Sequence, residues 1–279
     1  MNKNLNRAKS KKNDEFYTLY TDIVKELRNY NFNNMVIYCN CDTINSSFFQ
    51  FFYANFFELG IKKLICTGLG GYKIEFNGHS LSKSLLAADG DFRSVECLNI
   101  LKEVDCVVTN PPFSLFREFI SSIMRYDKKF LIIGNMNAIK YKEIFPLIMY
   151  NKMWLGVNYV HSFIQPNGEI KKFGNINWYT NLDNHKRHEM VDLCKLYNSK
   201  DYPKYDTYDA IECSKVSDIP KDYEGIIGVP ISFLSKYNPK QFEIVGEFNH
   251  GSDNKFDLAK PIINGKELYP RIAIKITPT

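Results

Sequence analysis

Four short apolar runs in the first half of the chain constrain its fold more than any other feature. They are residues 35–39, 63–67, 103–109 and 130–134. Each run is short and largely apolar, as is typical of a strand that is buried on both faces. Segments with a helical pattern lie between such runs, and strands that alternate with helices form a mostly parallel sheet. We therefore expect an α/β fold in which helices cover both faces of that sheet.

Two helices can be placed from their caps and from the spacing of their apolar residues. Ser46 and Ser47 are suited to cap a helix that runs through Leu59 and ends at Gly60. Ser114 is suited to cap a second helix, whose apolar residues recur at helical spacing. Those apolar residues are Leu115, Phe116, Phe119, Ile120 and Ile123. The loops at 39–46 and 110–114 then lie between the carboxyl end of a strand and the start of a helix.

Composition excludes several classes of protein. The chain has 279 residues, 44% of them hydrophobic, and can bury a substantial core. It has no apolar run of about 18 residues or more, and residues 1–13 are a polar, basic arm where a signal peptide needs an apolar stretch. The seven cysteines are odd in number and form no C-x-x-C pair, which favours reduced thiols and no metal site. We expect a cytoplasmic protein with no membrane partner, whose net charge of +5 permits a nucleic-acid partner without requiring one.

The pattern loosens from about residue 181, where charged residues, proline, glycine and aspartate become more frequent. Three candidate strands remain in this part, at 210–213, 226–234 and 271–276. We interpret residues 181–279 as a smaller, β-rich accessory region that follows a main domain at 14–180.

The loop at 110–114 contains the tetrapeptide Asn110-Pro111-Pro112-Phe113. In parallel sheets, ligands bind beyond the carboxyl ends of the strands, which is where this loop is expected. Two successive prolines fix the backbone and remove two N–H donors, so the loop is a rigid site of acceptor oxygens. The side-chain oxygen of Asn110 and the carbonyl of Pro111 can accept both hydrogens of a planar NH2 group, while Phe113 stacks on the attached ring. Such a loop suits methyl transfer to a weakly nucleophilic amine, and a stiff Pro-Pro turn is the structural alternative.

The sequence as a whole resembles the EcoRI-type family of adenine-specific DNA methyltransferases over most of its length. The resemblance depends on an ordered set of stretches and not on Asn-Pro-Pro-Phe alone. The stretches are KNDEFYTLYTDIVKEL (12–27), VIYCNCD (36–42), GDFRSVE (90–96), VVTNPPFS (107–114), LIIGNMNAIKYKEIFPLI (131–148), NINWYTNL (175–182), GVPISFLSKYNPKQFEIVG (228–246) and NGKELYPRIAIK (264–275). The resemblance implies a Rossmann-like methyltransferase sheet at 14–180, with S-adenosylmethionine as methyl donor and adenine N6 in double-stranded DNA as acceptor. Residues 181–279 would then recognise the target.

The resemblance also implies roles for individual residues. The cofactor-binding residues would be Phe16, Tyr17, Thr18, Cys39, Asn40, Asp42, Asp91 and Phe92. The catalytic loop would be Asn110, Pro111, Pro112 and Phe113, and the target base would be held by Phe113, Trp178 and Tyr179.

Some positions depart from the common pattern or have a simpler interpretation. The loop after the first strand has no glycine, although many methyltransferases have a Gly-x-Gly turn there. The second strand ends in Cys66-Thr67 and not in an acidic residue, and the glycines at 68–71 are interpreted as a tight turn. Asp42 can be a turn or cap residue, and Trp178 can be a core residue.

The leading hypothesis is a site-specific DNA adenine-N6 methyltransferase that flips its target base into a pocket between the catalytic loop and Trp178. It would be a monomer of restriction-modification origin, with an endonuclease for the same site as a candidate partner. A first alternative keeps the cofactor and changes the acceptor to cytosine N4, an RNA base or a protein glutamine. A second alternative is a non-catalytic DNA-binding scaffold.

Overall fold

The protein forms two compact units in the computed structural model, which describes residues 17–68, 70–165, 167–249 and 254–277. The first unit comprises Met1–Ala138 and Leu155–Leu182, and the second comprises Ile139–Trp154 and Asp183–Thr279. The basic arm at 1–13 and the expected cofactor residue Phe16 lie outside the described ranges.

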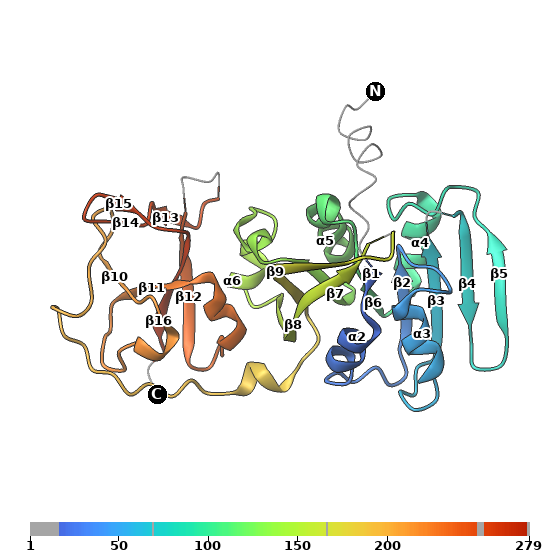
Figure 1. Cartoon of the computed structure of the whole chain (residues 1–279), viewed down its shortest axis with the longest axis horizontal. Coiled ribbons are helices and arrows are strands. Elements are labelled where there is room, and N and C mark those ends of the chain that lie inside the picture. Colours follow the sequence, from blue (N-terminus) through green and yellow to red (C-terminus); the bar gives the residue numbers. More distant parts are fainter. Residues whose placement is uncertain (1–16, 69, 166, 250–253, 278–279) are drawn as a thin grey trace, which may run out of the picture. The chain divides into compact units, whose positions relative to one another are not determined.

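A nine-stranded mixed sheet is the frame of the first unit (Figure 1). Its strand order is β1-β8-β9-β7-β6-β2-β3-β4-β5. The central strands β7-β6-β2-β3 are parallel and correspond to the four apolar runs of the sequence, although the run at 103–109 is a strand only from Cys106 because a helix continues to Glu103. Their bounds are Lys129–Asn135 (β7), Cys106–Thr109 (β6), Val36–Asn40 (β2) and Lys63–Gly68 (β3). The expectation of an α/β fold around a parallel sheet is confirmed.

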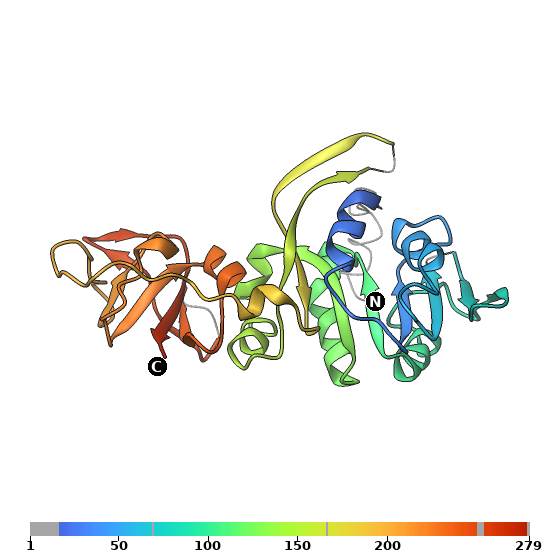
Figure 2. The ribbon, with the colours of Figure 1, turned by 90° about the horizontal axis from the view of Figure 1, so that it is seen from below.

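Helices cover both faces of this sheet, as Figure 2 shows. One face is covered by α2 and α3, and the other by α4 and α5. Their bounds are Tyr20–Leu27 (α2), Ser47–Ala54 (α3), Val95–Glu103 (α4) and Phe116–Arg125 (α5). Because alternate residues of a strand face opposite sides, Cys39 of β2 lies in the core beneath α2 and α3, whereas Asn40 faces the other side.

The sequence predicted the cap of one helix correctly and the cap of a second helix wrongly. Ser46 caps α3 as expected, because its hydroxyl accepts a hydrogen bond from the N–H of Phe49 at 3.1 Å. Ser114 does not cap α5, because a short 3-10 turn (η1, Phe113–Leu115) comes first. The carbonyl of Pro112 closes that turn by accepting from the N–H of Leu115 at 2.9 Å, so the α-helix begins at Phe116, one residue later than Ser114 as a cap would predict.

Antiparallel strands extend the parallel core at both edges, and the sequence did not predict them. β4 and β5 continue from β3, while β9, β8 and β1 continue from β7. Their bounds are Tyr72–Phe76 (β4), Leu81–Leu85 (β5), Trp154–Ile164 (β8), Ile170–Thr180 (β9) and Tyr17–Thr18 (β1). Between β3 and β4 the N–H of Gly71 donates to the carbonyl of Gly68 at 3.1 Å, which confirms a tight turn at the glycines.

A five-stranded sheet is the frame of the second unit, in the order β10-β11-β16-β12-β13. Its strands are Ala210–Glu212 (β10), Ile226–Pro230 (β11), Phe242–Phe248 (β12), Asp257–Ala259 (β13) and Arg271–Ile276 (β16), and Ile262–Ile263 (β14) pairs with Lys266–Glu267 (β15). Short 3-10 helices are Met136–Lys140 (η2), His185–His188 (η3), Val216–Asp218 (η4) and Ile231–Lys236 (η5). The expected strand at 226–234 stops at Pro230 because η5 follows it. A smaller β-rich C-terminal part is present, as expected.

Residues 139–154 group with the second unit, although the sequence was interpreted as one continuous domain from 14 to 180. This segment contains α6 (Phe145–Met149), which packs against β12. The rings of Phe145 and Tyr150 lie 6.3 and 5.6 Å from the ring of Phe256. These contacts join residues about a hundred positions apart, which a local pattern cannot reveal. No helix in the described ranges is long and apolar enough to cross a membrane.

Candidate active site

The carboxyl ends of β2 and β6 are neighbours at the point where the order of the parallel strands reverses. From β2 the chain continues to β3 on one side, and β6 then pairs with β2 on the other side. A reversal of this kind leaves a crevice beyond the strand ends, where α/β proteins bind ligands. Asn40 ends β2 and Asn110 follows β6. The two loops that the sequence singled out therefore flank the expected ligand crevice.

Thr109 joins these two loops. Its hydroxyl lies within hydrogen-bonding distance of the Asn40 carbonyl and, at 2.7 Å, of a carboxylate oxygen of Asp42. Thr109 is completely buried at the end of β6, directly before Asn110. One side chain thus fixes the start of the catalytic loop against the loop after β2.

Asp42 is a half-buried carboxyl group in the loop after β2. Burial raises its pKa from 3.8 to about 7, against hydrogen bonds from Thr109 and Ser46 that lower the pKa. Asp42 therefore has two side-chain partners within the protein, and its protonation changes near neutral pH.

Cys41 makes the turn that a glycine makes in many methyltransferases. Its φ is 66°, a left-handed conformation that favours glycine. Its Sγ and the hydroxyl of Thr67 approach the side-chain oxygen of Asn40 at 3.6 and 3.4 Å. Burial, together with the carboxylates of Asp42 and Asp91, raises the pKa of the Cys41 thiol well above its usual value. The thiol therefore stays protonated, and its role here is structural.

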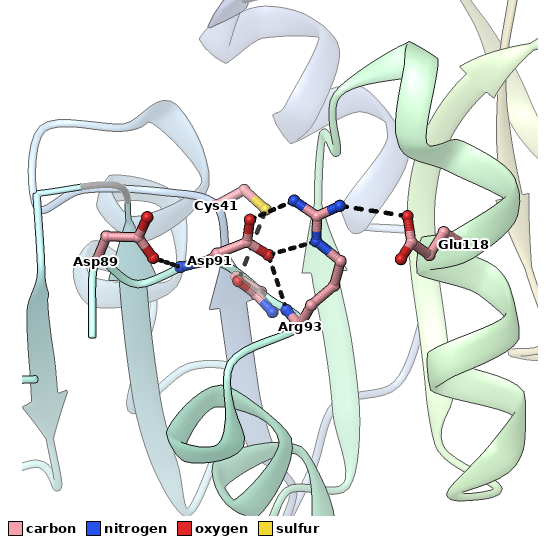
Figure 3. Close-up of polar contacts among 6 residues, drawn as sticks. Cys41, Asp89, Asp91, Arg93 and Glu118 are labelled. Atoms are coloured by element: carbon pink, nitrogen blue, oxygen red, sulfur yellow. Dashed lines mark hydrogen bonds and ion pairs between the residues drawn. The ribbon is translucent and has the colours of Figure 1, made fainter. Parts of the chain in front are cut away.

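The loop that contains Asp91 lies beside Cys41 of the loop after β2 (Figure 3). Arg93 donates from Nε and Nη2 to the two carboxylate oxygens of Asp91, at 2.8 and 2.5 Å, and its Nη1 lies 3.4 Å from Glu118 of α5. Figure 3 shows Cys41 beside this pair. The carboxylates of Asp91 and Glu118 raise the pKa of Arg93, so its guanidinium group stays positively charged. The carboxylate expected to contact the cofactor adenine is therefore oriented by an arginine.

Two close backbone approaches hold these loops together. A Cβ on Gly90, whose φ is +80°, would lie 2.0 Å from the carbonyl oxygen of Gly68. A Cβ on Gly68 would in turn lie 2.5 Å from the carbonyl oxygen of Asp42. Glycine is required at both positions, and the loops after β2, β3 and β5 are packed against one another.

The loop of Asn110, Pro111, Pro112 and Phe113, which is expected to be catalytic, is partly open. Pro111 is buried, whereas Asn110, Pro112 and Phe113 are half-buried. The ring of Phe113 packs edge-on against Phe163 of β8, with centroids 6.0 Å apart and an angle of 86°. The loop is therefore supported from beneath while part of it remains accessible.

Strand β1 reaches the same region through β8. Tyr17 pairs with Ile164 and Thr18 with Phe163, whose ring contacts Phe113. Thr18 is buried, and its hydroxyl has no hydrogen-bond partner among the described residues, whereas Tyr17 is 51% exposed. The structure thus brings two expected cofactor residues, Tyr17 and Thr18, close to Phe113, although about 90 residues separate them in the sequence.

Three predicted site residues have their side chains in the core. Trp178 is completely buried and packs edge-on against Phe48 of α3, with ring centroids 5.9 Å apart. Tyr179 faces the other side of the sheet, where its hydroxyl donates to the carbonyl of Asn135 at 2.9 Å. Cys39 is also completely buried. Phe48 of α3 packs against Trp178 and Phe116 of α5 packs against Tyr179, and this burial does not agree with the expectation that the two side chains hold a base.

Phe92 is likewise buried, with its ring edge-on to Phe119 of α5 at 4.9 Å. Its neighbour Asp91 is half-buried, so this pair combines an apolar wall with an oriented carboxylate. Among the described residues, no group of three or more metal-ligating side chains comes together.

Sequence reasoning missed Thr109, Arg93 and Phe163. Thr109 and Arg93 lie within the quoted stretches VVTNPPFS and GDFRSVE, so their positions beside site residues were available as a signal. Phe163 had no such signal, because its contact with Phe113 depends on the place of β8 in the nine-stranded sheet.

Comparison with known proteins shows the family to which this chain belongs. The family model described as adenine-specific methyltransferase EcoRI matches residues 4–83 and 73–275. The chain belongs to the EcoRI family of adenine-specific methyltransferases. It is 47% identical to the type II methyltransferase M.EcoRI of Escherichia coli, over 98% of this chain and 96% of that protein. It is 40% identical to a type II methyltransferase of Mycoplasma genitalium, over 97% of this chain and 98% of that protein.

A third relative of this EcoRI-family member is the type II methyltransferase M.MpnI of Mycoplasma pneumoniae, which is 38% identical over 86% of this chain and 84% of that protein. No solved structure is significantly similar to the chain. The family match covers every residue of the predicted site. The protein is an adenine-specific DNA methyltransferase of the restriction-modification type.

Proposed function

We propose that the protein transfers the methyl group of S-adenosylmethionine to N6 of an adenine that has been flipped out of duplex DNA. The observation that carries the proposal is the position of Asn110-Pro111-Pro112-Phe113 at the strand reversal, tied by Thr109 to Asp42. A loop of acceptor oxygens beside a ligand crevice is what methylation of an exocyclic amine requires.

The residues of the crevice fit S-adenosylmethionine. Thr18 has a buried hydroxyl that lacks a partner among the described residues, as a group awaiting a polar ligand would. Asp42 and Asp91 are half-buried carboxylates suited to hydroxyl and amino groups, and Phe92 lies beside Asp91 as an apolar wall. Tyr17 and Thr18 would hold the amino-acid end, and Asp42, Asp91 and Phe92 the nucleoside end. When bound, the cofactor supplies an electrophilic methyl group on a sulfonium.

Asn110 and Pro111 act on the acceptor amine. The side-chain oxygen of Asn110 and the Pro111 carbonyl accept hydrogen bonds from the two N–H groups of the adenine amine, which fixes the direction of the nitrogen lone pair. The new N–C bond would form as the S–C bond of the sulfonium breaks and its sulfur leaves as a neutral thioether, and the same oxygens would stabilise the positive charge that passes to the amine. The surplus proton then leaves to water. A general base before transfer is not needed.

Phe113 supplies the stacking surface for the flipped base. It is half-buried, and Phe163 supports its ring from the side. Flipping is required because N6 of a stacked, paired adenine cannot reach a cofactor in the crevice. In this proposal Trp178 packs the sheet beneath the site and does not touch the base, since its side chain is completely buried.

Further parts of the proposal concern the setting of the enzyme. We assign target recognition to the second unit, with lysines and arginines on phosphates and polar side chains on base edges. We also propose that the enzyme acts as a cytoplasmic monomer and shares its target with an endonuclease.

Nucleoside mass spectrometry of DNA from cells that express the protein tests the proposal. N6-methyladenine should appear in cells with the wild-type protein and be absent from cells with an empty vector. N4-methylcytosine in its place, or no modified base at all, would overturn the proposal in favour of another acceptor or a scaffold role.

A further inference from the structure

Glu26 of α2 is a completely buried carboxylate outside the site described above. It accepts hydrogen bonds from the hydroxyl of Tyr30 at 2.6 Å and from the backbone N–H groups of Val157 and Asn158 at 2.8 and 2.7 Å. It also accepts from Nδ2 of Asn158 at 2.9 Å. Three of these four donors belong to β8, so the carboxylate fastens α2 to that strand.

The strand is shaped to receive this carboxylate. A Cβ on Gly156 would lie 2.2 Å from Oε1 of Glu26 and 2.5 Å from Cβ of Trp178. No side chain fits at this position without displacing the carboxylate or β9. The glycine therefore gives Glu26 its access to the N–H groups that follow it.

The segment 17–27 is attached to β8 at two places. At one end, Tyr17 and Thr18 form the two-residue strand β1, paired with residues 163–164. At the other end, Glu26 binds residues 157–158. A two-residue strand is a weak attachment by itself, so the direction in which β1 meets β8 depends on the second anchor.

We propose that Glu26 is a positioning residue for cofactor binding, which holds α2 on β8 so that Tyr17 and Thr18 stay beside Phe163 and the catalytic loop. This inference rests on the proposed function, because it assumes that Tyr17 and Thr18 contact the cofactor. Glu26 itself touches neither the crevice residues nor the catalytic loop in any contact described above.

A packing role alone does not account for a carboxylate at this position. Ile23 and Leu27 of the same helix are completely buried apolar residues, and they supply packing without the cost of burying a charge. That cost is visible in the pKa of Glu26, which burial raises above its usual value. A carboxylate adds directed hydrogen bonds, which define one position of α2 along β8.

Calorimetric titration of the full-length protein with S-adenosylmethionine tests the inference. In Glu26→Gln an NH2 group faces a backbone N–H of β8, and in Gly156→Ala a methyl group displaces the carboxylate. We expect both variants to bind the cofactor roughly ten- to a hundredfold more weakly, while turnover at saturating cofactor changes by less than about threefold. In hydrogen exchange, the amides of residues 17–18 and 163–164 should lose protection.

Two controls separate positioning from general destabilisation. Tyr30→Phe removes the one donor that does not belong to β8 and leaves the bonds to β8, so cofactor affinity should stay within about twofold of wild type. Glu212→Gln removes a comparably buried carboxylate in the second unit, where Arg271 binds it at 2.9 Å, and should lower the melting temperature without changing cofactor affinity. If Glu26→Gln does not fold, the cofactor affinity of Gly156→Ala compared with that of Tyr30→Phe still tests the inference.

The outcomes are distinct. Wild-type affinity in folded Glu26→Gln and Gly156→Ala would overturn the inference alone. An equal loss of affinity in Glu212→Gln would also overturn it, because the effect would then be general. Absence of S-adenosylmethionine binding by the wild-type protein would overturn the proposed function and this inference with it.

Discussion

At the scale of single residues, Thr109 and Cys41 explain how a loop without glycine forms a ligand crevice. Cys41 adopts the left-handed φ of 66° that a glycine would supply, and Thr109 bonds to both Asn40 and Asp42 on either side of it. Residues held in sparsely populated backbone conformations concentrate at functional sites, since the surrounding structure must hold them there. The absence of glycine at 40–46 is thus compensated by side-chain bonds.

The raised pKa of Asp42 predicts a dependence of stability on pH. Its pKa is about 7 in the folded protein and 3.8 without burial, so the folded state binds the proton more tightly than the unfolded state does. The stabilising contribution is complete below about pH 4 and is lost as the pH rises through about 7. After screening by solvent we expect a loss of about 2 kcal/mol in the free energy of unfolding.

Urea unfolding of the Trp154→Phe variant, followed by tryptophan fluorescence, measures this effect in the first unit. Trp178, which lies in that unit, is then the only tryptophan of the chain. Addition of Asp42→Asn should flatten the pH dependence between pH 4 and 8. Glu247→Gln is the matched control: burial raises the pKa of Glu247 to about 7 as well, but this residue lies in the second unit. Equal slopes with and without Asp42 would contradict the assignment.

At the scale of elements, the β8–β9 hairpin contributes more than sheet pairing. Both strands are 11 residues long, and the hairpin extends beyond the rest of the first unit in Figure 2. Its distal part exposes Tyr159, Ile170, Lys171 and Lys172. Phe163 and Phe173 of the same hairpin pack together at 5.5 Å, and Phe163 contacts Phe113. A duplex whose base reaches Phe113 would therefore pass close to these lysines.

We predict that the double variant Lys171→Ala and Lys172→Ala binds duplex DNA more weakly and with less dependence on salt. Each lost phosphate contact reduces the slope of log affinity against log salt by roughly 1. Fluorescence anisotropy over a series of salt concentrations measures that slope. Lys102→Ala with Lys128→Ala is a matched control, because Lys102 is exposed, Lys128 is half-buried, and both lie beside the amino ends of β6 and β7. A slope equal to that of wild type in the hairpin variant would contradict the prediction.

At the scale of the whole molecule, the sequence predicted what local patterns determine. Continuous apolar runs identified the four parallel strands, and the rigid Asn-Pro-Pro-Phe loop was correctly placed at a strand end. The antiparallel strands β4, β5, β8 and β9 were missed because they are partly exposed, so no continuous apolar run marks them.

Contacts between distant residues account for the remaining differences. Thr18 pairs with Phe163, and Glu26 accepts a hydrogen bond from the N–H of Val157. Each of these contacts joins positions more than a hundred residues apart. The same holds for the grouping of 139–154 with the second unit. The burial of Trp178 beneath α3 likewise depends on the complete sheet, and a large aromatic near the site in sequence was no guide to its exposure.

The most direct test of the central claim is a single-turnover methylation assay with Asn110→Ala, on duplex DNA and with labelled S-adenosylmethionine, beside calorimetric binding of the cofactor. Loss of one of the two acceptors of the adenine amine should slow methyl transfer by about a thousandfold or more and leave cofactor affinity within about twofold of wild type. Asn99→Ala, an exposed asparagine of α4, should behave as wild type in both measurements. Near-normal methyl transfer by Asn110→Ala would contradict the assignment of this loop as the catalytic site.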